Sequence, residues 1–354
     1  MGEAKRGYAR PLDLKRGRVD LTHGSGGRAM VQLIAEVFAR HLGNAYLAQG
    51  NDGAVLPAPV LQGKPARLVM STDSHVVSPL FFPGGDIGSL AVHGTLNDVA
   101  MMGATPLYLT AGFILEEGFA LADLARIVAS MAQAARDAGV SVVAGDTKVV
   151  ERGKGDGVFI TTSGVGVLPE GLELGGARAR PGDAVIVSGS MGDHGVAIMS
   201  QRENLSFDAT IESDSAALHD LVAAMLATRA ALRCLRDPTR GGLAATLNEI
   251  AVQSGVGMML QERAIPVKPV VAAACELLGL DPLCVANEGK LIAICAAADA
   301  ARLLAAMRAH PLAREAAVIG EVIADARHFV QLDTAFGGRR IVEWLAGDQL
   351  PRIC

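Results

Sequence analysis

The sequence has few cysteines and few aromatic residues, and both shortages exclude classes of protein. Its five cysteines contain no CxxC pair, and their odd number and spacing fit neither a zinc site nor a disulfide framework, which favours a reducing compartment. Aromatic residues make up 4% of the chain, whereas half of it is apolar and 41 residues are glycine. This composition is typical of an α/β enzyme and not of a disordered or fibrous chain.

The chain also lacks an unbroken apolar segment and an excess of basic charge. The apolar run at 291–307 is interrupted by Asp299 and Arg302, so it does not span a bilayer. Residues 1–20 are a basic tail without the apolar stretch that follows in a secretory signal. The net charge of −5 argues against a nucleic-acid-binding protein, whose surface would be basic. We expect a cytoplasmic protein that has no nucleic-acid or membrane partner.

The length of the chain and the order of its predicted elements indicate two α/β (α+β) domains. A chain of 354 residues exceeds the usual single core, and strands alternate with helices along it. A stretch rich in glycine, at 169–181, marks the boundary. The predicted helices are 28–42, 88–102, 120–138, 214–232, 242–254, 270–278 and 299–309, and the predicted strands are 67–71, 107–115, 140–144, 158–167, 184–188, 256–260, 291–296 and 317–323.

Four aspartates in the first half stand beside small residues, where strands end or helices begin. Small neighbours let a ligand approach the backbone, and clustered carboxylates suit Mg²⁺ that also holds substrate phosphates. Each aspartate alone also fits a turn or a helix cap. Asp98 is the most informative, because it shares a predicted helix with Gly94 and Asn97, which are weak helix formers. The four candidate metal ligands are Asp52, Asp73, Asp98 and Asp146.

Two segments have the composition of phosphate-binding loops. His23–Gly27 precedes the first predicted helix, whose free N–H groups could face an anion, although a flexible lid fits this segment equally well. Arg236–Leu243 combines two arginines, a proline and a Gly-Gly helix start, which can surround a phosphate; the alternative is a stiff loop with a salt bridge. The candidate ATP- or phosphate-binding residues are Gly26, Gly27, Asn97, Asp98, Asp146, Asp237 and Arg240.

Lys148 and Glu288 are the candidate groups for charge stabilisation and proton transfer. Lys148 stands two residues after Asp146, so in an extended segment both side chains share a face. There it could neutralise phosphate charge, or it could form only a surface ion pair. Glu288 lies beside Gly289 and before a predicted strand, where it could act as a general base or belong to an ordinary polar turn.

The last residue is a cysteine, Cys354. It ends a Gly-containing stretch, 336–354, that we predict to be a mobile arm, because chain ends are poorly ordered unless docked. A fully extended arm would reach about 55–60 Å at ~3.3 Å per residue. A thiol on such an arm suggests covalent carriage of a small group between active sites, and the alternative is a stray surface cysteine.

Eight short motifs are spread over the chain: His23–Gly27, Pro83–Gly88, Gly94–Asp98, Gly145–Val150, Gly192–Gly195, Arg236–Leu243, Asn287–Lys290 and Pro351–Cys354. Together they resemble the HypE family, the carbamoyl dehydratases of [NiFe]-hydrogenase maturation. That family lies in the superfamily of aminoimidazole-ribotide synthetase and selenophosphate synthetase. The aspartate motifs are shared across the superfamily, whereas the terminal Pro-Arg-Ile-Cys is specific to HypE.

The resemblance implies a fold and an assembly. It implies two PurM-like domains, at 21–168 and 169–335, followed by the arm at 336–354. It also implies a homodimer joined through the N-terminal sheets, with ATP bound near the cleft between subunits. ATP and Mg²⁺ are the implied cofactors.

The resemblance further implies the reaction and its partners. HypF would deliver a carbamoyl group to the sulfur of Cys354, and ATP-dependent dehydration would convert this S-carboxamide to an S-cyanate. Lys148 would stabilise charge on the activated carboxamide, and Glu288 would remove the amide proton. The cyano group would then pass to iron on the HypC–HypD complex, as the cyanide ligand of the [NiFe] site.

Two other functions would use parts of the same pattern. A small-molecule kinase or synthetase of the superfamily, acting on thiamine phosphate or selenide, would keep the aspartates but would not need a terminal thiol. A selenophosphate synthetase would also require a reactive residue near its N-terminus, where this chain has no cysteine. A metal-delivery scaffold using Cys354 would have only one thiol and no neighbouring ligand, which makes a poor site.

Overall fold

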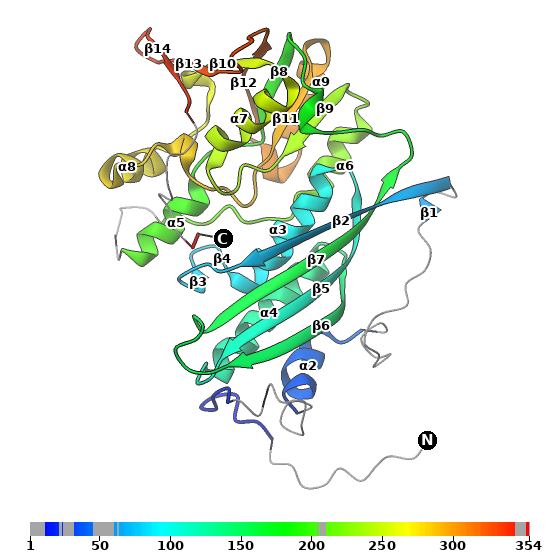
Figure 1. Cartoon of the computed structure of the whole chain (residues 1–354), viewed down its shortest axis with the longest axis vertical. Coiled ribbons are helices and arrows are strands. Elements are labelled where there is room, and N and C mark those ends of the chain that lie inside the picture. The colour runs from blue at the N-terminus through cyan, green and yellow to red at the C-terminus, as the bar shows by residue number, and fades with distance from the viewer. Residues whose placement is uncertain are drawn as a thin grey trace.

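The computed structural model describes residues 11–20, 23, 32–44, 60–61, 64–203, 205, 210–343 and 352–353 (Figure 1). Its N-terminal half is built on a five-stranded sheet with the order β1-β2-β7-β5-β6. The strands are β1 (Val60–Leu61), β2 (Lys64–His75), β5 (Thr105–Glu116), β6 (Ser141–Val150) and β7 (Val158–Pro169). A separate small hairpin joins β3 (Phe81–Phe82) and β4 (Gly85–Asp86).

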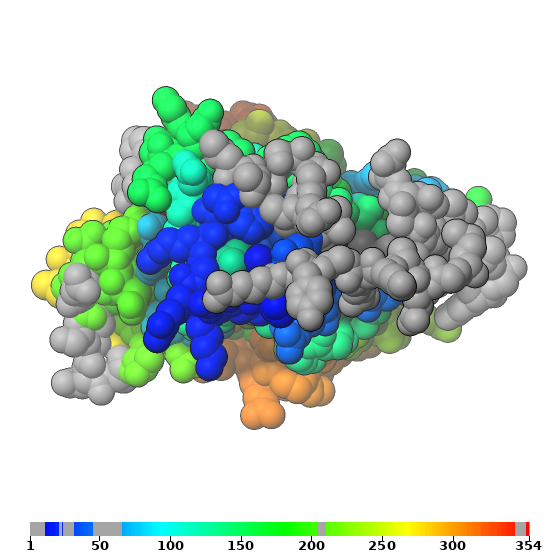
Figure 2. Space-filling view, turned by 90° about the horizontal axis from the view of Figure 1, so that it is seen from below, coloured from blue at the N-terminus to red at the C-terminus, as the bar shows by residue number. Residues whose placement is uncertain are grey.

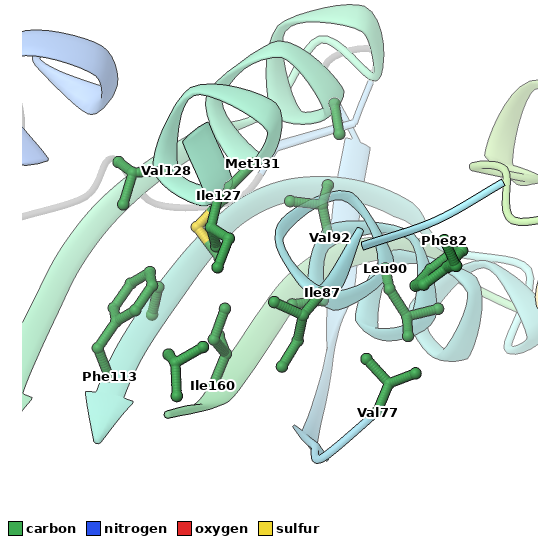
Figure 3. Close-up of a cluster of buried hydrophobic side chains, with 14 of the residues drawn as sticks. Val77, Phe82, Ile87, Leu90, Val92, Phe113, Ile127, Val128, Met131 and Ile160 are labelled. Atoms are coloured by element: carbon green, nitrogen blue, oxygen red, sulfur yellow. The ribbon is translucent and has the colours of Figure 1, made fainter. Parts of the chain in front are cut away.

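Helices cover one face of this sheet. They are η2 (Ile34–Phe38), α2 (Ala39–Leu42), α3 (Ile87–Met101) and α4 (Leu121–Asp137), and α3 and α4 lie side by side behind the strands in Figure 1. In α4, Leu124, Ile127, Val128 and Met131 recur at helical spacing and are fully buried, as Figure 3 shows for the last three. Asp86 caps the N-terminus of α3 in a capping box with Ser89.

No helix of the described chain covers the opposite face of the sheet. Side chains alternate between the two faces of a strand, and on this open face Leu68 is 56% exposed, Met70 71% and Ile114 43%. Residues 11–20 and 32–44 lie at the lower end of the molecule, which Figure 2 views from below. The open face therefore presents an apolar surface that the described part of the chain leaves in contact with solvent.

The C-terminal half is a seven-stranded sheet with the order β14-β13-β10-β12-β8-β11-β9, covered on both faces. Val185 and Val187 of β8 pack toward α7, whereas Ala184 and Ile186 pack toward α6 and α9. The strands are β8 (Asp183–Val187), β9 (Leu232–Arg236), β10 (Gly257–Gln261), β11 (Ile292–Ala296), β12 (Ala317–Ile323), β13 (Val330–Asp333) and β14 (Arg339–Ile341). The helices are α5 (Asp193–Arg202), α6 (His219–Ala227), α7 (Gly242–Ser254), α8 (Pro269–Leu278) and α9 (Ala297–Ala309), with short turns η4 (Gly176–Arg178), η5 (Glu262–Ala264), η6 (Pro282–Cys284) and η7 (Pro311–Ala313).

The alternation of strands and helices predicted from the sequence is confirmed, with three main differences. The strand predicted at 67–71 runs over twelve residues to His75, because β2 pairs with β7 along its length. The strand predicted at 140–144 continues to Val150 beside β5, so Asp146 and Lys148 lie within a strand. The helix predicted at 214–232 is wrong: only His219–Ala227 is α-helical, and Leu232–Arg236 is a strand.

Four regular elements of the C-terminal half were not predicted: α5, β9, β13 and β14. Strand β14 (Arg339–Ile341) pairs with β13, so the first residues of the predicted arm belong to the sheet. Val342, which follows β14, is 2% exposed. No helix in the described part of the chain is long and apolar enough to cross a membrane.

Candidate active site

Carboxylates from both halves of the chain meet on the helix-covered side of the N-terminal sheet. Asp73 stands near the end of β2 and Asp98 on α3, where Ser71 donates a hydrogen bond to Oδ2 of Asp98 at 2.7 Å. Asp237 follows β9, and Glu288 precedes β11. The sequence motifs that contain these residues therefore converge, although they lie up to 215 residues apart, from position 73 to position 288.

Glycine at position 94 makes room for this cluster. A Cβ atom on Gly94 would lie 2.9 Å from Nε2 of His75 and 3.3 Å from Oδ2 of Asp73. His75 is buried, with Nε2 3.3 Å from Oδ2 of Asp73, and burial lowers its pKa. A neutral imidazole thus lies beside Asp73 without cancelling its charge.

Burial and the charges of neighbouring carboxylates raise the pKa values of Asp98, Asp237 and Glu288. Burial raises the pKa of Asp98, and the charge of Asp73 adds to this effect. Burial and the charge of Asp98 raise the pKa of Asp237 to about 7. The pKa of Glu288 lies well above its ordinary value, first through burial and then through the charges of Asp237 and Asp214. Such a cluster attracts a cation, because a cation would relieve the repulsion between the ionised groups.

Glu288 is the most enclosed member of the cluster. The residue is 3% exposed, and its Oε1 atom has no hydrogen-bond partner in the described part of the chain. Its backbone is fixed at both ends: the N–H donates to Oδ1 of Asp214 at 3.0 Å, and the carbonyl accepts from Nδ2 of Asn97 at 3.1 Å. The next residue must be glycine, because a Cβ atom at Gly289 would lie 1.7 Å from the carbonyl oxygen of Asp214.

Two buried asparagines hold the segments around Glu288 together. Asn97 donates to the carbonyls of Ala216 and Glu288 and accepts from the N–H of Leu218, so it joins α3 to the C-terminal half. Asn287 accepts from the N–H of Gly192 at 2.8 Å and donates to the carbonyl of Pro238 at 3.0 Å. Asn97 was predicted to bind phosphate. In this structure its side chain holds the backbone carbonyl of Glu288 in place.

Asp146 and Lys148 lie on the other face of the sheet. Their side chains share the open face, as their spacing predicts, and pair at 2.8 Å while remaining more than 60% exposed. Strand β6 is also three strands away from β2, which corresponds to about 14 Å at the usual strand spacing. Within one chain, therefore, the structure brings Asp73, Asp98, Asp237 and Glu288 together but does not bring Asp146 or Lys148 to them.

Of the remaining predicted residues, the structure describes only Arg240. Gly26, Gly27, Asp52 and Cys354 lie outside the described residues. Arg240 is exposed in the loop before α7, and the neighbouring Arg236 pairs with Glu249 at 2.6 Å. In the described ranges, no group of three or more His, Cys, Asp or Glu side chains is arranged so that it could hold a metal ion by itself. Ligands from a bound nucleotide or from further protein residues would have to complete the coordination of Mg²⁺, as is usual for this ion.

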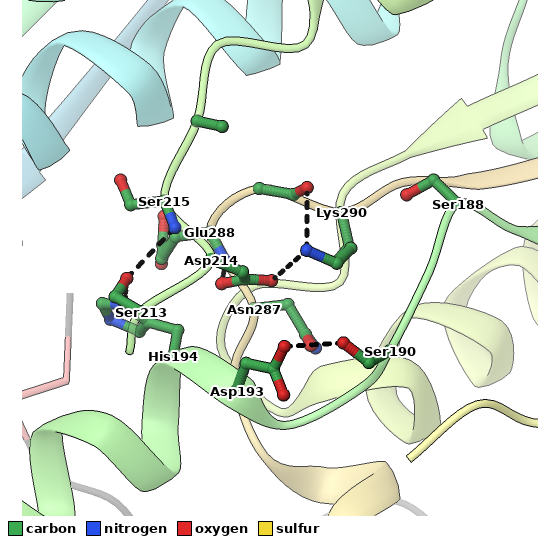
Figure 4. Close-up of polar contacts among 12 residues, drawn as sticks. Ser188, Ser190, Asp193, His194, Ser213, Asp214, Ser215, Asn287, Glu288 and Lys290 are labelled. Atoms are coloured by element: carbon green, nitrogen blue, oxygen red, sulfur yellow. Dashed lines mark hydrogen bonds and ion pairs between the residues drawn. The ribbon is translucent and has the colours of Figure 1, made fainter. Parts of the chain in front are cut away.

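The sequence analysis did not identify two lysine–aspartate pairs that lie close to Glu288. Lys290 pairs with the buried Asp214 at 3.3 Å (Figure 4). Lys268 pairs with the buried Asp193 at 2.6 Å. They line a cleft of 570 Å³ together with Ser188 and other residues. Asp214 carried no usable signal, because its surroundings resemble the start of a helix. Asp193 lies in the predicted Gly192–Gly195 motif, to which no role was assigned.

Comparisons with known proteins agree with this architecture. The family models "AIR synthase related protein, N-terminal domain" and "AIR synthase related protein, C-terminal domain" match residues 50–168 and 180–333. A carbamoyl dehydratase HypE from Cupriavidus necator is 70% identical over 353 residues, which cover 100% of this chain and 99% of the relative.

Two solved structures extend the comparison. The crystal structure of hydrogenase maturation protein HypE in complex with ATP is 50% identical, covers 94% of this chain and 99% of its own, and superposes with a TM-score of 0.90. In the structure of a HypE–HypF complex, a chain 49% identical, with a TM-score of 0.76, covers 88% of this chain and 99% of its own. On this identity and coverage, the chain belongs to the HypE family, the carbamoyl dehydratases of hydrogenase maturation.

Proposed function

We propose that this chain dehydrates a carboxamide bound to its own Cys354. The reaction converts an S-carboxamide to an S-cyanate and supplies the cyanide ligand of the [NiFe] active-site iron. The family to which the chain belongs supports this assignment, and so does the cysteine at its end. A kinase acting on a free small molecule has no use for that cysteine.

The observation that carries the proposal is the buried carboxylate of Glu288. A nitrile forms from an amide only when the nitrogen loses its protons, so the site needs a base close to the carboxamide. Glu288 has an unpartnered Oε1 atom and a raised pKa. Once ionised, it is a stronger base than an ordinary carboxylate, which is the property that general-base catalysis near neutral pH requires.

ATP and Mg²⁺ fit the carboxylate cluster. ATP, when bound, supplies the phosphoryl group that turns the carboxamide oxygen into a leaving group. Asp73 and Asp98 would hold the cation, with Asp52 as a further candidate, because hard carboxylate oxygens suit Mg²⁺. Ser71 orients Asp98 through its 2.7 Å hydrogen bond. Asp237 and Arg240 would face the phosphates from the loop before α7.

A second copy of the chain would bring the missing groups. The open face of the N-terminal sheet is apolar at Leu68, Met70 and Ile114, and β6 is an edge strand of the sheet. We propose that two such sheets pair in a homodimer. The partner's Lys148, paired with its own Asp146, would then lie at the interface between the subunits, where it would stabilise negative charge on the activated carboxamide.

The proposed reaction needs a donor and an acceptor. HypF is the proposed donor of the carbamoyl group, and a solved HypE–HypF complex supports this pairing. The HypC–HypD complex is the proposed acceptor of the cyano group. All of these steps would take place in the cytoplasm, where a free thiol stays reduced.

Mass spectrometry of the C-terminal peptide tests the proposal. The purified chain is incubated with HypF, carbamoyl phosphate, Mg²⁺ and ATP. We expect a carbamoyl adduct on Cys354 that then loses one water as ATP is consumed. Cys354→Ala should carry no adduct, whereas Cys284→Ala serves as a matched control and should behave like the wild type. An adduct that persists in Cys354→Ala would contradict the proposal.

A further inference from the structure

The end of the chain is held against the protein body by its backbone. The carbonyl oxygen of Arg352 accepts hydrogen bonds from the N–H of Ser78 at 3.1 Å and from Nη2 of Arg202 at 2.8 Å. The carbonyl oxygen of Ile353 lies 2.8 Å from Nε2 of His194. The side chain of Ile353 is buried, at 1% exposure, in the core that contains α3 and α5.

Arg352 carries two further signs of a specific docking geometry. Its guanidinium pairs with Oδ2 of Asp156 at 2.5 Å. Its φ angle is +55°, in the left-handed region that non-glycine residues rarely adopt. A residue keeps this conformation only when surrounding contacts fix it. The docking site therefore determines the conformation of the segment that carries the terminal residue.

The tautomer of His194 follows from its partners. The carbonyl of Ile353 can only accept a hydrogen bond, so Nε2 of His194 must carry the proton. Burial lowers the pKa of His194, so the ring is neutral near pH 7. Its Nδ1 atom then accepts from the hydroxyl of Ser213 at 2.7 Å. The ring also stacks edge-to-face on Phe82, with 5.6 Å between centroids, which fixes its plane.

The same short segment holds both His194 and Glu288 (Figure 4). Ser213 binds Nδ1 of His194, and Asp214, the next residue, accepts from the backbone N–H of Glu288 at 3.0 Å. Ser213 is fixed in turn by the N–H of Ser215, which donates to its hydroxyl. The histidine that contacts the chain end and the loop that carries the proposed base are thus joined through two adjacent residues.

We propose that His194 and Arg202 are positioning residues for the C-terminal segment, which they bind through the carbonyls of Ile353 and Arg352 to place the terminal residue at the Glu288 site of the same chain. This inference rests on the proposed function. Because the contacts involve backbone oxygens, a group carried on the terminal sulfur leaves them intact.

Hydrogen exchange and single-turnover kinetics test this inference in the full-length protein. In His194→Ala the amide of Ser78, which donates to Arg352, should exchange faster, as read from a peptide covering residues 76–82. The rate at which the carbamoylated protein loses water after ATP is added should fall about tenfold or more. Nucleotide affinity should stay near the wild-type value, whereas the midpoint of thermal unfolding should fall in His194→Ala, because the imidazole is fully buried.

Matched variants separate positioning from folding. His194→Gln keeps an N–H donor near the Nε2 position and should restore part of the rate, whereas Arg202→Ala should lower the rate as His194→Ala does. His310→Ala, a histidine in the turn before η7, is the control and should match the wild type in both measurements.

Two outcomes would overturn the inference, and both differ from failure of the proposed function. The inference is wrong if His194→Ala frees the chain end but dehydrates at the wild-type rate or faster, because the docked state would then be a resting position. It is also wrong if the exchange at Ser78 does not change. If the wild type itself takes up a carbamoyl group but never loses water with ATP, the proposed function fails instead.

Discussion

The backbone N–H of Glu288 donates to Oδ1 of Asp214, and the other oxygen of Asp214 lies 3.3 Å from Nζ of Lys290. Asp214 thus fixes the backbone of the proposed base and neutralises a lysine two residues further along. Its side chain is 2% exposed, and its charge also contributes to the raised pKa of Glu288. One aspartate therefore helps to fix the position of Glu288 and adds to the effect of burial and of Asp237 on its basicity.

Replacing Glu288 should separate the two halves of the reaction. In Glu288→Gln we expect HypF still to carbamoylate Cys354, while loss of water slows by about 10²–10⁴-fold, the usual contribution of a general base. Mass spectrometry of the C-terminal peptide over time distinguishes the two adducts. Glu321→Gln, an exposed change on β12, should leave both steps unchanged. Dehydration by Glu288→Gln at the wild-type rate would exclude Glu288 as the base.

Removing Asp214 should destabilise the fold. Asp214→Ala leaves Lys290, whose side chain is 13% exposed, without its partner, and it also leaves the N–H of Glu288 without an acceptor. Breaking a buried pair in this way costs about 3–5 kcal/mol of the free energy of unfolding. The matched control is Asp333→Ala, which breaks a more exposed pair with Arg339 and should cost less than about 1 kcal/mol. Urea unfolding measures both, and equal losses would contradict the expectation.

Asp237 should make stability depend on pH. Its pKa is about 7 in the folded chain, against an ordinary value of 3.8. Between these values the folded chain keeps a proton that the unfolded chain has lost, so the free energy of unfolding falls as pH rises through this window. Asp237→Asn removes this loss, and its midpoint of thermal unfolding should exceed that of the wild type by about 2–4 °C at pH 8.

The control for Asp237 uses the same measurement at other pH values. Near pH 4 the unfolded chain has only begun to lose the Asp237 proton in excess of the folded chain, so most of the difference in stability between variant and wild type should vanish. Asp220→Asn changes an aspartate whose side chain is 76% exposed and should shift nothing at either pH. A gain in Asp237→Asn that is the same at pH 4 and pH 8 would rule out ionisation as its cause.

Mixed dimers test whether Lys148 acts across subunits. Lys148→Ala and Glu288→Gln should each be inactive alone. A mixed dimer would contain one site with both residues intact, so an equal mixture should recover about a quarter of the wild-type activity if the chains exchange freely in a symmetric dimer. Mixing Lys148→Ala with the double variant provides the control and should recover nothing. If the first mixture also stays inactive although mixed dimers form, Lys148 does not serve the other chain's site.

The sequence predicted most of the elements because their patterns are local. Helix α4 follows from apolar residues at helical spacing, and α7 follows from its Gly-Gly start at residues 241 and 242. Helix 214–232 was wrong because Asp214 and the residues after it use their polar groups for long-range contacts, which helix propensity does not register. Strand β2 was predicted too short for a related reason: its polar end is stabilised by pairing with β7.

The sequence alone determined which residues are chemically suited to the reaction: small residues beside carboxylates, a glutamate next to Gly289, and a cysteine at the chain end. Only the tertiary structure decided which of them meet. It placed Asp73 and Asp98 beside Glu288 and put Lys148 on the opposite face of the sheet. It also revealed the contact between His194 and Ile353. Motif spacing gives the residue types, but the side of a sheet on which a residue lies depends on strand register and on how two domains pack.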